Sequence, residues 1–191
     1  MIVDHTPPSV LLLMGVSGCG KTTTAHRLAR RLNWPFRDGD SFHPVSNVEK
    51  MKAGLPLTDD DRWPWLDAIG AWIDDQRAMP GKAIVTCSAL KRIYRQRLLH
   101  NRLDVQLVYL KGSRQLIGDR VSRRRNHFMP PALLDSQFAV LEEPRGAERP
   151  VVVSVAMPPN RVVERILTLT RLHEPRDAGL GHKADEGPGK I

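Results

Sequence analysis

The eight residues at positions 15–22 restrict the possible folds of this chain more than any other segment. They read Gly-Val-Ser-Gly-Cys-Gly-Lys-Thr and match the pattern G-x-x-x-x-G-K-[ST] at every position. A wholly apolar run at 10–14 precedes them, as expected of a buried parallel strand, and apolar residues recur with helical spacing over 25–32. Strand, glycine-rich turn and helix in this order predict a loop whose backbone N–H groups surround phosphate oxygens at a helix N-terminus.

We interpret this loop as the binding site of a nucleoside triphosphate, because a chance glycine turn would not be flanked by both a strand and a helix. Lys21 would reach the outer phosphates, and the Thr22 hydroxyl could ligate Mg²⁺. The residues of this segment that we assign to the nucleotide are Gly15, Val16, Ser17, Gly18, Cys19, Gly20, Lys21, Thr22 and Thr23.

Apolar runs and helical periodicity alternate along the rest of the chain. Strands are expected at 10–14, 34–38, 83–87, 105–110 and 151–155. Helices after the first are expected near 45–52, 64–79, 90–100, 114–124, 133–141 and 160–172, with Pro64 as the first residue of its helix. This alternation predicts a single α/β domain over residues 1–173, with a parallel sheet and right-handed crossovers. The tail at 174–191 contains glycine and proline but no aromatic residue, and we expect it to be disordered.

The composition bears on partners and location. The formal net charge of +8 raises the question of a nucleic-acid partner, but aromatic residues make up only 5% of the chain and do not alternate with the arginines. We therefore expect no nucleic-acid partner. Cys19 and Cys87 imply no disulfide framework, and the N-terminal apolar run is too short for a signal or membrane segment. These features predict a cytoplasmic protein without a membrane contact.

Three uses of a phosphate-binding loop compete: a regulatory GTPase, a motor-type ATPase and a small-molecule kinase. The sequence has no guanine-reading Asn-Lys-x-Asp, and its D-x-x-G match at 67–70 lies inside a predicted helix. No carboxylate ends the third, fourth or fifth predicted strand, where a motor ATPase normally holds its magnesium.

Asp38 and Asp40 instead follow the second predicted strand. The carboxyl ends of parallel strands meet at one crevice, so these residues are expected beside the phosphate-binding loop. Asp40 could accept the proton of an alcohol while Asp38 supports the magnesium shell, which favours a small-molecule kinase. The alternative for this pair is an ordinary acidic turn.

Further motifs follow the loop in order along the chain. They are D-G-D-S-F-H-P at 38–44, D-D-D-R-x-P-W-L at 59–66, C-S-A-L-K-R-x-Y-R at 87–95, H-F-M-P at 127–130 and L-L-x-S-Q-F at 133–138. Together they resemble the small, phosphate-loop type of gluconokinase, a relative of shikimate kinase, from about residue 10 to residue 167. The resemblance implies a three-layer P-loop kinase fold with a five-stranded parallel sheet and a helical lid at about 120–140. It also implies a homodimer that transfers the γ-phosphate of ATP to the 6-hydroxyl of D-gluconate.

Predicted roles follow for the acceptor side of the site. Asp40 would orient and deprotonate the acceptor hydroxyl. Lys91 and Arg95, four residues apart on one predicted helix face, would clamp the gluconate carboxylate. His43 would contact the polyol, unless it is a solvated loop histidine. The acidic segment at 59–62 either caps the following helix or contributes to the site, and the sequence leaves both readings open.

Predicted roles on the lid and nucleotide side rest on the same resemblance. Arg124 would contact the transition state, Arg120 the ATP phosphates and His127 the substrate. Arginines carried by a lid would neutralise charge on the transferring group and exclude water. Pro158, in the loop after the fifth predicted strand, would pack against the adenine.

Other functions compatible with these motifs are a shikimate-like or nucleotide kinase, an ATP-dependent nucleic-acid-binding protein and a nucleotide-binding module without turnover. The acceptor that consumes ATP separates the first from a gluconokinase. A salt titration of nucleic-acid binding tests the second. The third would bind ATP and show no acceptor-dependent turnover.

Overall fold

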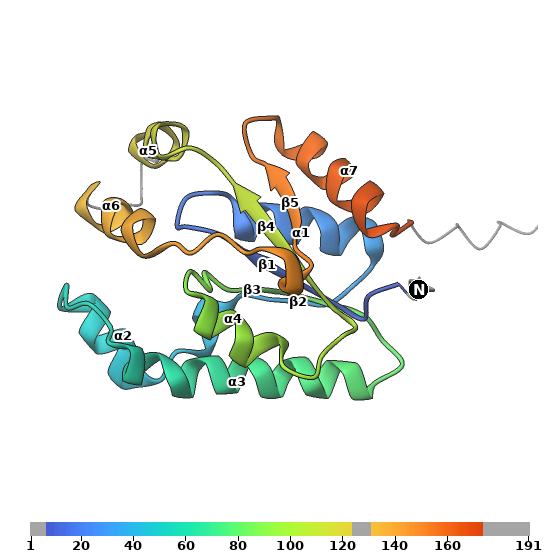
Figure 1. Cartoon of the computed structure of the whole chain (residues 1–191), viewed down its shortest axis with the longest axis horizontal. Coiled ribbons are helices and arrows are strands. Elements are labelled where there is room, and N and C mark those ends of the chain that lie inside the picture. Colours follow the sequence, from blue (N-terminus) through green and yellow to red (C-terminus); the bar gives the residue numbers. More distant parts are fainter. Residues whose placement is uncertain (1–6, 124–130, 174–191) are drawn as a thin grey trace, which may run out of the picture.

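The computed structural model describes residues 7–123 and 131–173. They form a five-stranded, all-parallel sheet in the order β2-β3-β1-β4-β5 (Figure 1). The strands are β1 (Val10–Met14), β2 (Phe36–Arg37), β3 (Ala83–Thr86), β4 (Val105–Lys111) and β5 (Val151–Ser154). The strand that precedes the glycine-rich loop is therefore central, and the carboxyl ends of its two neighbours flank that loop.

The burial of β1 explains why its sequence is continuously apolar. All five of its residues are fully buried, because both faces of the sheet are covered. Leu11 and Leu13 point into one hydrophobic core, and Val10, Leu12 and Met14 point into the other. The alternation of side chains along a strand thus divides one apolar run between two cores.

Helices cover both faces of the sheet. They are α1 (Lys21–Leu32), α2 (Val45–Lys52), α3 (Asp59–Ala78), α4 (Arg92–Leu99), α5 (Arg114–Ser122), α6 (Pro131–Val140) and α7 (Pro159–Thr170), with 3₁₀ turns η1 (Gly39–Phe42) and η2 (Gly146–Glu148). Helices α1, α5 and α7 pack into the core of Leu11, whereas α3 and α4 pack into the core of Val10. Figure 1 shows α3 and α4 together below the sheet. This arrangement confirms the predicted three-layer α/β kinase fold.

The start of α3 differs from the prediction. The helix begins at Asp59 and contains Pro64, which was expected to be its first residue. Thr58 forms a capping box with Asp61, and the first turn carries three aspartates that favour the positive end of the helix dipole. These two stabilising features start the helix five residues before the proline. The second strand is also shorter than predicted, with only two residues.

Several predictions concern residues outside the described part of the chain. Arg124 and His127 lie in the segment 124–130, and the tail at 174–191 lies there as well. The expectation about the tail and the roles given to these two residues stay predictions. Within residues 7–123 and 131–173, no helix has the length and apolar character needed to span a membrane.

Candidate active site

The glycine-rich loop joins the central strand to α1. Gly15, Gly18 and Gly20 have φ values of 144°, 82° and 101°, which side-chain-bearing residues rarely adopt. Gly18 also lies against α5, because a Cβ atom there would be 2.4 Å from Cγ2 of Val121. The backbone conformation of the loop therefore favours glycine at all three positions, and the close approach of α5 is a second requirement for glycine at position 18.

Two side chains of the loop have distinct roles in its structure. The ammonium of Lys21 donates to the carbonyl oxygens of Gly15 and Val16, at 3.0 and 3.3 Å, and so lies along the loop. Cys19 is buried, and this burial raises the pKa of its thiol despite the nearby charge of Lys21. Cys19 consequently acts as a small, neutral packing residue. It and Cys87 are both free thiols, as the sequence predicted.

Asp38 connects the ends of three strands. Its carboxylate accepts hydrogen bonds from the Thr22 hydroxyl at 2.8 Å, the Thr86 hydroxyl at 3.0 Å and the Asp40 backbone N–H at 3.1 Å. Thr22 follows β1, Asp38 follows β2 and Thr86 ends β3. The predicted convergence of loop and carboxylates at one edge of the sheet is therefore present, and Thr86 is a member that the sequence reasoning missed.

The pair of Thr22 and Asp38 suits a magnesium ion. Mg²⁺ prefers hard oxygen ligands and is usually held by one or two protein groups together with substrate phosphates. A hydroxyl and a carboxylate oxygen 2.8 Å apart beside the phosphate-binding loop match that requirement. In the part of the chain that the structure describes, no cluster of three or more His, Cys, Asp or Glu residues could hold a metal.

Gly39 explains the spacing of the two aspartates. It packs so closely on the end of β3 that a Cβ atom would lie 1.9 Å from the Thr86 carbonyl oxygen. Its N–H donates to the Thr86 hydroxyl at 3.2 Å, and its carbonyl accepts from the indole N–H of Trp65 at 2.7 Å. Only glycine fits between the two carboxylates, so the backbone on both sides of it is fixed.

Asp40 differs from Asp38 in that no hydrogen bond to its carboxylate is present among the described residues. The side chain is exposed. Its backbone N–H, by contrast, is tied to Asp38. The residue therefore has a fixed backbone and an open carboxylate, which is the combination required of a group that must receive a substrate.

His43 is held in place and is not a solvated loop histidine. Its ring stacks on Trp65 with centroids 4.3 Å apart and planes inclined by 13°, and its Nδ1 lies 3.4 Å from Nδ2 of Asn47. Asn47 is itself buried and donates to the Asp61 carbonyl oxygen. Burial lowers the pKa of His43, although the charge of Asp40 partly opposes this effect. A neutral imidazole beside Asp40 can donate or accept a hydrogen bond to a hydroxyl.

The acidic segment at 59–62 caps α3 and also contacts Lys91, a predicted substrate ligand. Asp61 caps α3, and its hydrogen bonds with Lys50 and Thr58 lower its pKa to about 2. Asp59 binds the Lys91 ammonium at 2.7 and 2.8 Å and accepts a 2.5 Å hydrogen bond from the Tyr94 hydroxyl. The capping residue is therefore structural, whereas Asp59 positions a predicted substrate ligand.

Arg62, the last residue of the segment for which the sequence left a role in the site open, belongs to the same group. Its guanidinium lies 3.4 Å from Asp59 and 3.3 Å from the Tyr94 hydroxyl. Its charge also acts on His43 and lowers the pKa of that ring. The side chain of Arg62 thus brings a positive charge that acts on both Asp59 and His43. Its position directly after three aspartates was the available sequence signal.

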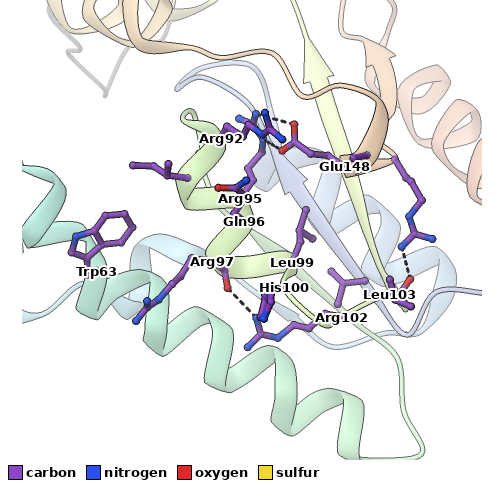
Figure 2. A pocket seen from close by; sticks show the side chains of 14 residues that line it. Trp63, Arg92, Arg95, Gln96, Arg97, Leu99, His100, Arg102, Leu103 and Glu148 are labelled. Atoms are coloured by element: carbon purple, nitrogen blue, oxygen red, sulfur yellow. Dashed lines mark hydrogen bonds and ion pairs between the residues drawn. The ribbon is translucent and has the colours of Figure 1, made fainter.

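Arg95 corrects the predicted pairing with Lys91. Its side chain is 1% exposed and forms a two-point ion pair with Glu148, with an Nε–Oε1 distance of 2.5 Å. Its remaining terminal nitrogen donates to the carbonyl oxygens of Ala89 and Leu90. Figure 2 shows the two side chains turned toward each other. All three guanidinium nitrogens are engaged, so Arg95 stabilises the fold and is unsuited to clamp a substrate carboxylate.

The cavity around this ion pair is separate from the phosphate-binding loop. It has a volume of about 1010 Å³ and is lined by Trp63, by α4 with the residues that follow it up to Val105, and by the segment 147–149, and no residue of the phosphate-binding loop contributes to it (Figure 2). Arg97 and Arg102 line it too, and they pair with Asp67 and Asp74. Most of its positive charge is therefore matched by carboxylates.

The two remaining predicted nucleotide ligands lie near the end of β5. Arg120, on α5, donates to the Val155 carbonyl oxygen at 2.5 Å, and its charge acts on Cys19 of the phosphate-binding loop. Pro158 is the N-cap of α7. The fold thus brings Arg120 near the loop, whereas a contact of Pro158 with adenine stays a prediction.

A phosphate-binding loop after the central strand, two carboxylates after β2 and cations on the surrounding helices define a P-loop kinase for a small molecule. The family model for shikimate kinase matches residues 17–153. A gluconokinase of Gluconobacter oxydans (strain 621H) is 48% identical over 161 residues, which cover 84% of this chain and 90% of the relative. The thermoresistant gluconokinase of Escherichia coli (strain K12) is 40% identical over 150 residues, with 78% and 84% covered.

A solved structure agrees with these relatives. The crystal structure of a gluconokinase from Sinorhizobium meliloti 1021 has a TM-score of 0.78 and 42% identity, and the match covers 86% of this chain and 92% of that one. The chain belongs to the gluconokinase family, within the broader group of shikimate-kinase-like proteins.

Proposed function

We propose that this protein transfers the γ-phosphate of ATP to the 6-hydroxyl of D-gluconate, with Mg²⁺ bound at Thr22 and Asp38. The observation that carries the proposal is the arrangement of Asp40. Its backbone is fixed by the Asp38 carboxylate and by the close packing of Gly39, and its own carboxylate has no hydrogen bond in the described part of the chain. The names of the relatives support the substrate.

The donor side follows from the loop. Backbone N–H groups of the loop and of the N-terminus of α1 bind the phosphates, apart from the Ser17 N–H, which donates to Gln137. The Lys21 ammonium leaves its two loop carbonyls and binds the outer phosphates. Arg120 lies close enough to the loop to add positive charge. When bound, Mg²⁺ neutralises charge on the transferring phosphates. Asp38 and Thr22 supply the protein oxygens for it.

The acceptor side uses Asp40 as general base, which takes the proton of the 6-hydroxyl as that oxygen attacks the γ-phosphorus and the bond from the γ-phosphorus to the β,γ-bridging oxygen breaks to release ADP. His43, neutral and stacked on Trp65, hydrogen-bonds to a hydroxyl of the polyol. Lys91 binds the gluconate carboxylate, and Arg62 replaces Arg95 as its companion, because both cations lie on Asp59 at the same side of the site. We also propose that Arg124 and His127 bind the substrate from the lid. The protein is further proposed to be a homodimer and to be located in the cytoplasm.

The test is ADP release from Mg·ATP with gluconate, shikimate, glucose, glycerate and nucleoside monophosphates, beside a sample without acceptor. Turnover with gluconate is expected. Asp40→Asn should lower kcat by about 10²–10⁴-fold while ATP binding stays at the wild-type level, because the general base is lost and the loop is unchanged. Asp60→Asn, an exposed aspartate in the first turn of α3, is the matched control and should keep wild-type activity. Turnover with a different acceptor alone would show that gluconate is not the substrate. An active Asp40→Asn variant would show that Asp40 is not the general base.

A further inference from the structure

The backbone N–H of Ser17 requires a partner from outside the phosphate-binding loop. Residues 16–19 form a turn that is closed by a hydrogen bond from the Cys19 N–H to the Val16 carbonyl oxygen, at 3.2 Å. Gly18 follows Ser17 with φ of 82°, as a type II turn requires at its third residue. The N–H of the second residue in such a turn points away from the closing bond. A part-buried N–H left without a partner would be costly.

Gln137 supplies that partner from a distant part of the sequence. Its side-chain oxygen Oε1 accepts a 2.7 Å hydrogen bond from the Ser17 N–H, across 120 residues. The distance is at the short end of the range for an N–H···O bond. Gln137 lies in the L-L-x-S-Q-F motif, to which the site described above assigns no function.

The helix that carries Gln137 is anchored to the body of the protein. Leu134 is buried in the core that also contains α1, and Phe138 packs against that core from the next turn of α6. Asp135, between them, pairs with Arg114 at the start of α5. Because the helix is held on both sides of Gln137, its amide presents a fixed acceptor to the loop.

We propose that Gln137 is a positioning residue for ATP, which sets the turn of the phosphate-binding loop by holding the Ser17 N–H. This inference rests on the proposed function of the loop. When the acceptor is lost, Ser17 turns its N–H toward water or another partner, and the neighbouring N–H groups lose their common direction toward the phosphates. Affinity for ATP and the rate of transfer should fall together, whereas affinity for gluconate should not change.

The experiment compares Gln137→Met, which removes the acceptor at similar volume, with Gln137→Asn, which keeps an amide but is one methylene too short. Kd for Mg·ATP is measured by calorimetry without gluconate, and KM for gluconate and kcat are measured at saturating ATP. Both variants should bind ATP about tenfold more weakly, as expected for one lost hydrogen bond, with an unchanged KM for gluconate. Ser136→Ala, which removes an exposed hydroxyl bonded to the Leu133 carbonyl on the same helix, should match the wild type.

Two results would overturn the inference. A folded variant with a Kd for ATP within twofold of the wild type would show that the contact is incidental. Tighter binding would show that Gln137 competes with the phosphates. Because Gln137→Asn keeps a polar helix surface, it serves as the test if Gln137→Met does not fold. Direct ATP binding also separates this inference from the proposed function, since a protein that binds ATP but does not phosphorylate gluconate still yields the Kd ratio.

Discussion

One group of charged residues lies at the carboxyl ends of the strands and another lies on α4. The two groups differ in whether their charges are paired with charges of opposite sign. At the strand ends, the Asp40 carboxylate has no hydrogen bond among the described residues, and the Lys21 ammonium donates to two backbone carbonyls. On α4, the charge of Arg95 is fully matched by Glu148 in a buried ion pair. Both groups are rich in charge in the sequence, and only the structure separates the one that can receive a substrate from the one that cannot.

The difference is one of energy as well as of position. A buried guanidinium without its carboxylate has a large desolvation cost, so Arg95 and Glu148 are each required by the other. Lys91, one turn earlier, is 30% exposed and pairs with a 39% exposed Asp59, a contact that a substrate carboxylate can replace at small cost. Exposure therefore decides which of two neighbouring cations is available for binding.

Replacing Arg95 should give the largest effect in this comparison. Arg95→Met removes one member of the buried pair and leaves Glu148 with an uncompensated charge. We expect the free energy of unfolding in urea to fall by about 3–5 kcal/mol. The folded fraction should keep the wild-type KM for gluconate, since the Arg95 guanidinium is engaged by Glu148 and by backbone carbonyls and is not available to a substrate.

The matched control is Arg97→Met on the same helix. Arg97 also pairs with an aspartate through two nitrogens, but its side chain and that of Asp67 are 53% and 49% exposed. This variant should lose at most about 1 kcal/mol. The comparison fails if Arg95→Met is nearly as stable as the wild type and raises the KM for gluconate strongly, because Arg95 would then be a substrate ligand.

A smaller effect is expected from a methyl group at the strand-end site. Gly39→Ala places a Cβ atom against the Thr86 carbonyl oxygen, which is backbone and has little room to move. Overpacking of this kind costs about 1–3 kcal/mol, and the shift it forces should displace both aspartates and lower kcat. Urea unfolding and ADP release measure the two effects.

Gly81→Ala is the control for this substitution, because a Cβ atom there meets nothing within 4 Å. It should leave stability and activity near the wild-type values. If Gly39→Ala retained full kcat, the spacing of the two carboxylates would matter less than their identity, and Asp40 would be less tightly positioned than the structure indicates.

Much of the fold could be predicted because its signals are local. The apolar run of β1, the glycines of the loop and the aspartates after β2 are each contained in a few adjacent residues, and the parallel sheet brings them together. The start of α3 was missed although its signal is also local. The prediction gave Pro64 more weight than the Thr58–Asp61 capping box, which is the stronger start signal.

The partners of the site residues could not be predicted in the same way. Glu148 lies 53 residues from Arg95, and Gln137 lies 120 residues from Ser17. Helical spacing predicted one shared face for Lys91 and Arg95, but α4 begins at Arg92 with Lys91 as its extended N-cap, and the two side chains bind Asp59 and Glu148 respectively. The spacing carried no information on which of them the fold would bury, because that depends on the path of η2 and not on the helix itself.

The smallest expected effect is the part of the pH dependence of stability that comes from the buried pair of Arg95 and Glu148. Burial acts to raise the pKa of Glu148, but the hydrogen bonds from Arg95 and from the Arg145 N–H outweigh it, and the net pKa lies below the ordinary 4.5. The unfolded chain therefore binds this proton more readily than the folded protein. The contribution to stability is complete above pH 4.5 and is lost as the pH falls through the lower folded-state value.

Urea unfolding between pH 7 and pH 3 should show a shallower loss of stability for Glu148→Gln than for the wild type. Because buried pairs are weakly screened, the difference should persist at about 0.5 M salt. Equal slopes would mean that Glu148 is not held as a carboxylate by Arg95, and the contrast between the two charged groups would then rest on position alone.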